Sequence, residues 1–270
     1  MKPWLHSGVF LLLAAGTLCA HDTWLVPESF RVQAGRPLKV ALNTSEDFPV
    51  SEAAAGPDRI ARFEVVSAAG RREVTGYRVE GKSLVAEVTP GQGVTLVAAV
   101  TRPRLIVLEP KEFNNYITEE RLDDIVAARA ARDETTAEGR ERYSKIAKLV
   151  LCADSTFLAF RHHRYREPLG LRLEIIPLTN PCELRENDIL IVQVLFEGRP
   201  LANAWVVVGT TGTHGHHYPY RQRTDAEGGA MVPFFRSGAW FVRVLHMVPA
   251  TEFDDADWQS WFSTLTFAVE

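Results

Sequence analysis

Short runs in which apolar and β-branched residues alternate with polar residues fill two long stretches of the chain. The first stretch includes LKVALNT, ARFEVVSAAGR and VTLVAAVTRP, and the second includes LRLEIIPL, ILIVQVLFEG and AWFVRVLHMVP. Runs of this length separated by turn residues are typical of antiparallel sandwiches. We therefore expect a mainly β protein with an N-terminal β-sandwich over residues 21–107 and a C-terminal β-sandwich over residues 168–270. Trp205, Trp240 and Phe267 fall in strand-like runs, so we expect them inside the second sandwich.

The segment 108–167 has a different period. Apolar residues recur at helical spacing from Leu122 to Arg129, and again from Tyr143 to Val150 after the capping-box pattern Thr135-x-x-Glu138. The pattern predicts a short helical insert, with two amphipathic helices, between the sandwiches. Within the first sandwich, Gly81-Lys82-Ser83 is a plausible hairpin turn.

Residues 1–20, MKPWLHSGVFLLLAAGTLCA, have the layout of a secretory signal peptide. The apolar run from Val9 to Ala15 is too short to span a bilayer, and no later run reaches the length of a transmembrane helix. We expect cleavage after Ala20, a periplasmic or secreted mature protein and no transmembrane segment in the mature chain. Lipidation at Cys19 is a minor alternative, because Leu18 is not the small residue that it requires. The net charge of −4 makes nucleic acid an improbable partner.

Cleavage after Ala20 would make His21 the first residue of the mature chain. An N-terminal histidine offers its α-amine and its imidazole Nδ1 to one metal ion, and nickel(II) and copper(II) suit such nitrogen donors. The alternative is that His21 follows the cleavage site by chance in a disordered terminus.

Four further histidines are candidate metal ligands: His214, His216, His217 and His246. The first three lie in a glycine-flanked loop that is able to turn imidazoles toward one ion, and short histidine-rich tracts are known metal-binding compositions. The alternative is a solvated polar loop. His246 shares a strand face with apolar residues, where a histidine is usually a packed core residue.

Other polar groups are more simply explained as surface. His162 and His163 lie among arginines and predict an exposed basic loop, and residues 252–257 predict a solvated acidic loop. Cys152 and Cys182 are the two cysteines that remain after the leader. In an oxidising compartment they most simply form a disulfide, and metal binding by the thiols is the less favoured reading.

Several stretches carry a resemblance to a known family. They are LRLEIIPLTNP, LFEGRPLANAWVVV, TDAEGGAMVPF, SGAWFVRVLH, WQSWFSTLTFAV and the opening HDTWLVP. The chain resembles a bacterial periplasmic family of unknown function that is grouped with periplasmic components of cobalt and nickel uptake systems. The resemblance implies immunoglobulin-like or transthyretin-like sandwiches and transition-metal handling.

The main hypothesis is an exported protein, not an enzyme, that binds nickel, cobalt or copper for uptake or delivery to a membrane metal-uptake component. Its ligands would be His21 and the loop histidines. One alternative is a non-metal interaction module of paired sandwiches. A less favoured one is a copper oxidoreductase, because an N-terminal histidine chelate resembles the histidine brace of polysaccharide monooxygenases. No serine-hydrolase, P-loop or H-E-x-x-H motif is present.

Overall fold

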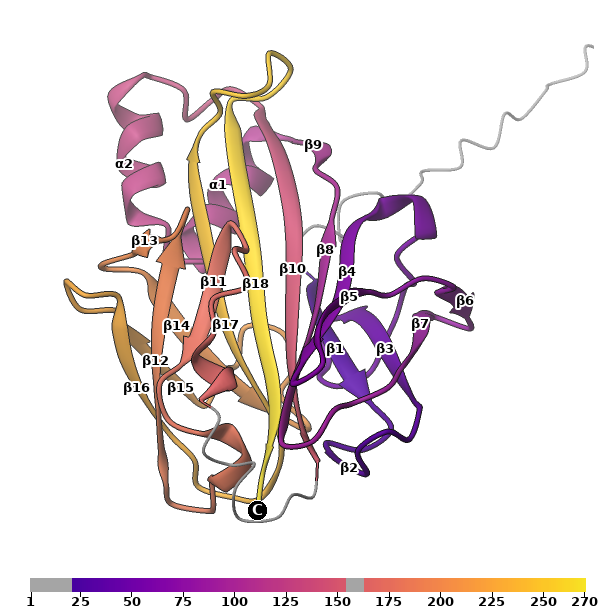
Figure 1. Ribbon diagram of the computed structural model, residues 1–270. Helices are drawn as coiled ribbons and strands as arrows, with labels where there is room; N and C mark the ends of the chain where they lie inside the picture. Colours follow the sequence, from indigo (N-terminus) through magenta and orange to yellow (C-terminus); the bar gives the residue numbers. More distant parts are fainter. Residues whose placement is uncertain (1–20, 154–162) are drawn as a thin grey trace, which may run out of the picture.

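The computed structural model describes residues 21–153 and 163–270. Strands make up about half of this part of the chain and form three sheets, with two short helices at one end (Figure 1). The mainly β, sandwich-type fold predicted from the sequence is confirmed. Within these two ranges, no helix has the length and apolar character needed to cross a membrane.

The central sheet has ten strands and runs through both halves of the chain. Its main path contains, in spatial order, β15 (Tyr220–Arg223), β14 (Trp205–Thr210), β17 (Gly238–Pro249), β18 (Trp258–Val269), β10 (Gly139–Ala153), β8 (Val94–Thr101), β4 (Ile60–Ser67) and β5 (Gly70–Glu73). Two more strands, β2 (Arg31–Val32) and β9 (Arg104–Leu108), pair with β10. The N-terminal and C-terminal strands meet where β10 and β18 pair in parallel.

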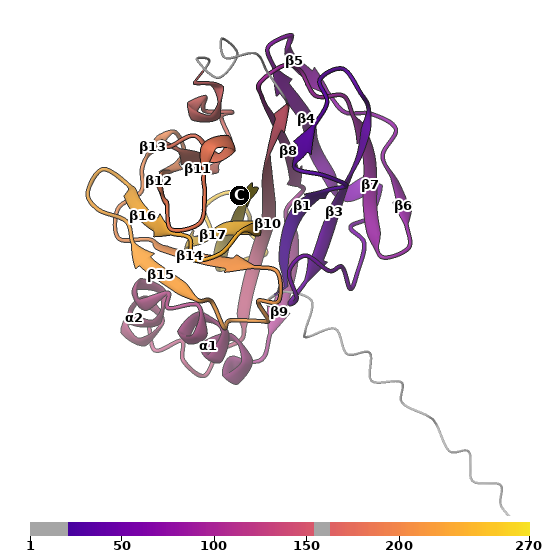
Figure 2. The same cartoon turned by 90° about the horizontal axis from the view of Figure 1, so that it is seen from below.

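Two smaller sheets pack on the central sheet. The first contains β1 (Asp22–Pro27), β3 (Leu38–Ser45), β7 (Ser83–Val88) and β6 (Arg78–Glu80), and the second contains β11 (Leu173–Pro177), β12 (Ile189–Phe196), β13 (Arg199–Pro200) and β16 (Gly229–Pro233). Along β10, Ala147 and Leu149 belong to the core of the first small sheet, whereas Ile146 and Val150 belong to the core of the second. Because side chains alternate along a strand, the two small sheets cover opposite faces of the central sheet (Figure 2).

The helices lie over one end of the central sheet. They are α1 (Pro110–Glu119) and α2 (Asp123–Ala131), and the described residues also include the 3₁₀ turns η1 (Pro57–Arg59), η3 (Arg164–Arg166) and η4 (Pro181–Glu183). Phe113 and Ile117 of α1 share a core with Trp258 and Phe262 of β18. The C-terminal end of α1 is thereby held against the central sheet.

The second predicted helix is wrong, because Tyr143 to Val150 lie in strand β10. Apolar residues from Ile146 onward fill both faces of this strand, apart from Lys148, and they are buried on both sides. A continuous apolar run fits a helical period as easily as a strand buried on two faces, so periodicity alone cannot decide between them. The segment expected as a helical insert therefore contributes a 15-residue strand to the central sheet.

Predictions about individual side chains have mixed outcomes. The hairpin is confirmed, since Glu80 pairs with Ser83. Trp240 and Phe267 are confirmed in the core, both with 0% exposure. The prediction for Trp205 is wrong: the ring is only half-buried, and the guanidinium groups of Arg121 and Arg223 lie over it. A strand-like run does not reveal which face is covered.

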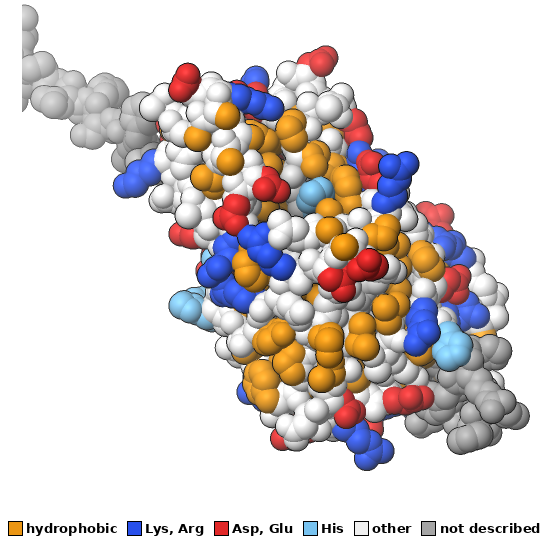
Figure 3. Space-filling model, turned by 90° about the vertical axis from the view of Figure 1, so that its left-hand side faces the viewer, with side chains coloured by type: hydrophobic (Ala, Val, Ile, Leu, Met, Phe, Trp, Pro, Cys, Tyr) orange, Lys and Arg blue, Asp and Glu red, His pale blue; other side chains and the backbone are white. Residues whose placement is uncertain are grey.

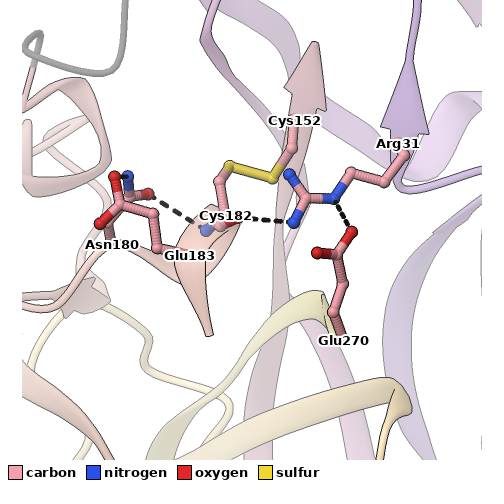
Figure 4. Close-up of a disulfide and its surroundings, with 6 residues drawn as sticks. All are labelled: Arg31, Cys152, Asn180, Cys182, Glu183 and Glu270. Carbon is pink, nitrogen blue, oxygen red and sulfur yellow. Dashed lines mark hydrogen bonds and ion pairs between the residues drawn. A yellow bond between two sulfur atoms is a disulfide. The ribbon is translucent and has the colours of Figure 1, made fainter. Parts of the chain in front are cut away.

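The predicted disulfide is confirmed between Cys152 at the end of β10 and Cys182 in η4, with Cα atoms 5.6 Å apart. Arg31 donates to the Cys182 carbonyl at 2.6 Å and pairs with Glu270 at 2.8 Å beside the bridge (Figure 4). The bridge ties the central sheet to the segment that leads into β12.

Candidate functional site

His21 immediately precedes β1 and is buried, with 8% exposure. Its ring lies between two carboxylates: Nε2 is 3.5 Å from Glu46 Oε1, and Nδ1 is 3.5 Å from Glu52 Oε2. Nδ1 is buried and has no hydrogen-bond partner in the described residues. A buried polar nitrogen without a partner is costly, so this atom is a candidate ligand position.

The next residue, Asp22, anchors the start of β1 to the central sheet. Its carboxylate pairs with Arg243 of β17 and accepts a hydrogen bond from the Tyr218 hydroxyl at 3.0 Å. Arg243 also donates to both oxygens of Glu120, which follows α1 directly, with a distance of 2.8 Å from Nη1 to Oε2. A single buried guanidinium therefore links the N-terminal strand, helix α1 and β17.

Electrostatics within this cluster favour the charged forms. Burial alone would raise the pKa of Glu120, but the charge and hydrogen bonds of Arg243 outweigh burial and hold that pKa below its ordinary value. Burial would likewise lower the pKa of Arg243, yet Asp22 and Glu120 raise it well above the ordinary value. Burial raises the pKa of Tyr218 well above its ordinary value. The cluster is an ion-paired network at neutral pH.

Lys145 of β10 holds the backbone at His21. Its Nζ donates to the His21 carbonyl oxygen at 3.0 Å and lies 3.2 Å from the centre of the Phe262 ring. Lys145 and Arg243 are both buried, and both cations lie over the Phe262 ring. The hydrogen bond from Lys145 therefore anchors the backbone that leads into β1.

The histidine-rich loop docks against the same region. The Gly215 amide donates to the Glu46 carbonyl at 2.8 Å, and His214 pairs through Nδ1 with Asp47. The hydrogen bond that His214 donates to Asp47 raises the pKa of His214 above its ordinary value. His21 and the loop therefore contact the same short segment, Glu46–Asp47, from two sides.

The other candidate histidines lie in different surroundings. His216 is half-buried, with Nδ1 3.9 Å from Glu120, and it lines a shallow cleft with Tyr218 and Arg243. His217 is exposed. His246 packs edge-to-face on Phe196 with 4.5 Å between ring centres, and burial lowers its pKa.

No three side chains of His, Cys, Asp or Glu in the described ranges are arranged to hold a metal ion. The loop and His21 approach one another, but through carboxylates: Glu46 for His21, Asp47 for His214 and Glu120 for His216. The predicted sharing of a metal between His21 and a loop imidazole stays a prediction.

Sequence reasoning missed the acidic and basic partners of this site. Glu46 and Glu52 lie on the segment that follows β3, and Asp22 meets Arg243 across 221 residues of sequence. No local motif marks such pairs. The sequence HDTWLVP contains Asp22, but nothing in this stretch indicates which cationic side chain forms an ion pair with the aspartate.

The two surface loops are partly described. His163 is exposed, whereas His162 lies outside the described residues. In the acidic loop, Glu252 pairs with Arg172 and Asp255 with Arg142. Its Glu252, Asp254 and Asp255 side chains are exposed, and Asp257 pairs with Arg140.

Comparison with known proteins gives distant structural likenesses. The D0-D1 domain of intimin aligns with 12% identity and a TM-score of 0.22, over 90% of this chain and 96% of that chain. A two-domain fibronectin type-III segment from chicken tenascin aligns with 12% identity and a TM-score of 0.23, over 90% and 98%. The Yersinia pseudotuberculosis adhesin InvE aligns with 10% identity and a TM-score of 0.24, over 93% and 59%. These values are too low to carry an argument about function.

The chain matches no curated protein. A family model described as Domain of unknown function (DUF4198) matches residues 18–248. That match spans most of the chain and ends near the end of β17, so the chain belongs to this family.

Proposed function

We propose that the exported mature protein binds a divalent transition metal (nickel, cobalt or copper) at its N-terminus, through His21. The observation that carries the proposal is the buried His21 ring, whose unpartnered Nδ1 lies 3.5 Å from Glu52 and whose Nε2 lies 3.5 Å from Glu46. Cleavage after Ala20 would free the α-amine of His21. This backbone nitrogen is a further donor, in addition to those of the side chains. Amine, imidazole and carboxylate together suit nickel(II), cobalt(II) and copper(II).

The surroundings of His21 support a preformed site. Lys145 holds the His21 carbonyl, and Arg243 holds Asp22, so the backbone on which the amine and imidazole lie is fixed on a sheet. Ligands on rigid elements lose little freedom on binding. The loop histidines are additional candidate ligands in this proposal. His214 and His216 each contact a carboxylate that lies in the same region as His21.

The proposed role is capture of the metal in the periplasm, or outside the cell, for delivery to a membrane metal-uptake component. The role requires binding without turnover. If the site were instead a histidine-brace copper oxidoreductase, the copper-loaded protein would form peroxide in a reductant-dependent way. Stoichiometric metal without peroxide supports the binding role.

The test compares two proteins by calorimetric titration with Ni²⁺ and with Cu²⁺. One begins at His21, verified by mass spectrometry, and the other carries four alanines ahead of His21. We expect about one metal per chain in the first and an affinity at least about 100-fold lower in the second, because the α-amine then lies too far along the chain to close a chelate ring with the His21 imidazole. Affinity should also fall on acidification, because protons displace the metal.

Two controls make this outcome decisive. The extended protein should unfold at the same temperature as the mature protein, and His163→Ala, which removes an exposed histidine elsewhere, should bind as the parent does. Equal affinity in the mature and extended proteins would contradict the proposal.

The second candidate is an interaction module, favoured by an exposed apolar surface on β12 and β16. Ile191 pairs with Met231 across the two strands, and both are exposed, Met231 by 50%. Ile189 and Phe235 are also exposed, and hydrophobic side chains gather on this side of the molecule (Figure 3). Exposed apolar clusters of this kind often mark protein interfaces.

Its direct test takes a second copy of the chain as the partner. Sedimentation velocity should give a concentration-dependent dimer that Met231→Lys weakens at least about tenfold, because a buried unpaired charge opposes association. Arg72→Lys, on the exposed strand β5, is the control. A protein that stays monomeric at high micromolar concentration removes this candidate in its self-associating form.

A further inference from the structure

A small cavity opens beside the start of β1. Three of its lining residues are cationic: Arg59 at the end of η1, Arg104 at the start of β9 and Lys145 on β10. The Tyr143 and Thr44 hydroxyl-bearing side chains also line it. None of the lining residues is acidic.

The two arginines of this cavity are outside the ion pairs of the protein. Among the ion pairs within residues 21–153 and 163–270, none includes Arg59 or Arg104. Partial burial lowers the pKa of Arg59; Tyr143 and Asp58 oppose this effect, and the like charge of Arg104 adds to it. Two guanidinium groups held near one another are stabilised when an anion binds between them.

The cavity walls are rigid. Tyr143 and Lys145 lie on β10 in the middle of the central sheet. The Lys145 backbone N–H donates a hydrogen bond to the Thr101 hydroxyl oxygen at 2.8 Å. The Thr23 and Thr44 hydroxyl groups are hydrogen-bonded at 3.0 Å across β1 and β3. Donors are therefore held in place on strands before any ligand arrives.

We propose that this cavity binds a small multivalent oxyanion, of the polycarboxylate or phosphate class. The Arg59 and Arg104 guanidinium groups present planar pairs of N–H donors that match carboxylate and phosphate oxygens. Lys145 adds a further positive charge to the cavity lining. Tyr143 lies beside Arg59, with 5.7 Å between the guanidinium carbon of Arg59 and the centre of the Tyr143 ring, and its hydroxyl also belongs to the lining side chain. The site is separate from the proposed metal ligands, so it binds the anion without metal.

The test uses metal-free mature protein, passed over a chelating resin, and two probes: citrate and inorganic phosphate. Binding is measured by calorimetry at constant ionic strength, so that general screening does not change. We expect at least one probe to bind, and Arg59→Gln and Arg104→Gln each to weaken that probe at least about tenfold, since each loses a charge-assisted pair of hydrogen bonds. Which probe binds distinguishes the polycarboxylate from the phosphate class.

Arg36→Gln is the matched control, because Arg36 is an exposed arginine in a turn outside the cavity, and it should bind within about twofold of the parent. Arg104 is exposed, so its variant should fold even where Arg59→Gln does not, and unfolding midpoints check both. Absence of binding by both probes overturns the proposal, as does equal binding by the parent and Arg104→Gln. Because no metal is present, neither result bears on His21.

Discussion

Replacing Arg243 with methionine is expected to destabilise the protein by about 3–5 kcal/mol at neutral pH. The guanidinium is buried and pairs with Asp22 and Glu120, which are also buried. Methionine keeps much of the side-chain volume but leaves two carboxylates in a low-dielectric site without a counter-charge. Chemical unfolding followed by tryptophan fluorescence measures the loss.

Removing the two carboxylates together with the arginine should restore stability. When Asp22→Asn and Glu120→Gln are added to Arg243→Met, no buried charge remains unpaired, and most of the lost stability should return. The single variant should also recover part of its stability in acid, where the two carboxylates take up protons. A loss below about 1 kcal/mol in Arg243→Met would mean that the cluster does not hold the N-terminal strand in place.

Replacing Glu141 with glutamine is expected to remove a pH-dependent loss of stability of roughly 3 kcal/mol. Glu141 is buried on β10, accepts hydrogen bonds from Ser260 and from Tyr116, and has one oxygen without a hydrogen-bond partner in the described residues. Burial, and to a smaller degree the charge of Glu120, raises its pKa to about 7, against the opposing effects of its hydrogen bonds and of Lys145.

The sign follows from the direction of the pKa shift. Between the ordinary pKa of 4.5 and about 7, the unfolded chain loses the Glu141 proton while the folded protein keeps it, so stability falls as pH rises through this window. Above it the loss is complete. Unfolding free energies from pH 4 to pH 8 should therefore fall less steeply in Glu141→Gln than in the parent. Equal slopes in the two proteins would contradict a neutral buried Glu141.

Much of the fold was predictable because the physical signals are local. Alternating runs predicted the strands, turn residues at 81–83 predicted a hairpin, and two surviving cysteines predicted the disulfide. The sequence predicts a helix where β10 lies. Apolar residues fill both faces of this strand, so they do not alternate with polar residues as they do in a strand buried on one face. Its parallel pairing with β18, which joins the two halves of the chain, has no sequence signature.

The site was predictable only in part, for a related reason. The signal-peptide pattern of residues 1–20 directs attention to His21, since the expected cleavage would create an amine beside an imidazole. The carboxylates that flank His21, and the arginine that anchors Asp22, come from strands and loops far away in sequence. The cationic cavity is similar: Arg59, Arg104 and Lys145 are ordinary charged residues until the sheets bring them together.

The contacts that anchor His21 and Asp22 connect the stability predictions to the proposed function. A chelate at a chain terminus is effective only when the terminal residue is held still, and here Lys145 and Arg243 hold the residues on either side of the His21–Asp22 peptide bond. Terminal residues are usually mobile, and the proposed chelate at His21 requires the anchoring that these two contacts provide.

The most direct measurement of the central claim is pulsed electron paramagnetic resonance of the mature protein loaded with one equivalent of Cu²⁺. The account predicts modulation from the remote nitrogen of a coordinated imidazole, which disappears in His21→Ala and in the protein with four alanines added ahead of His21. The signal should survive in His163→Ala, whose histidine is exposed and away from the site. An unchanged imidazole signal in His21→Ala would contradict the account.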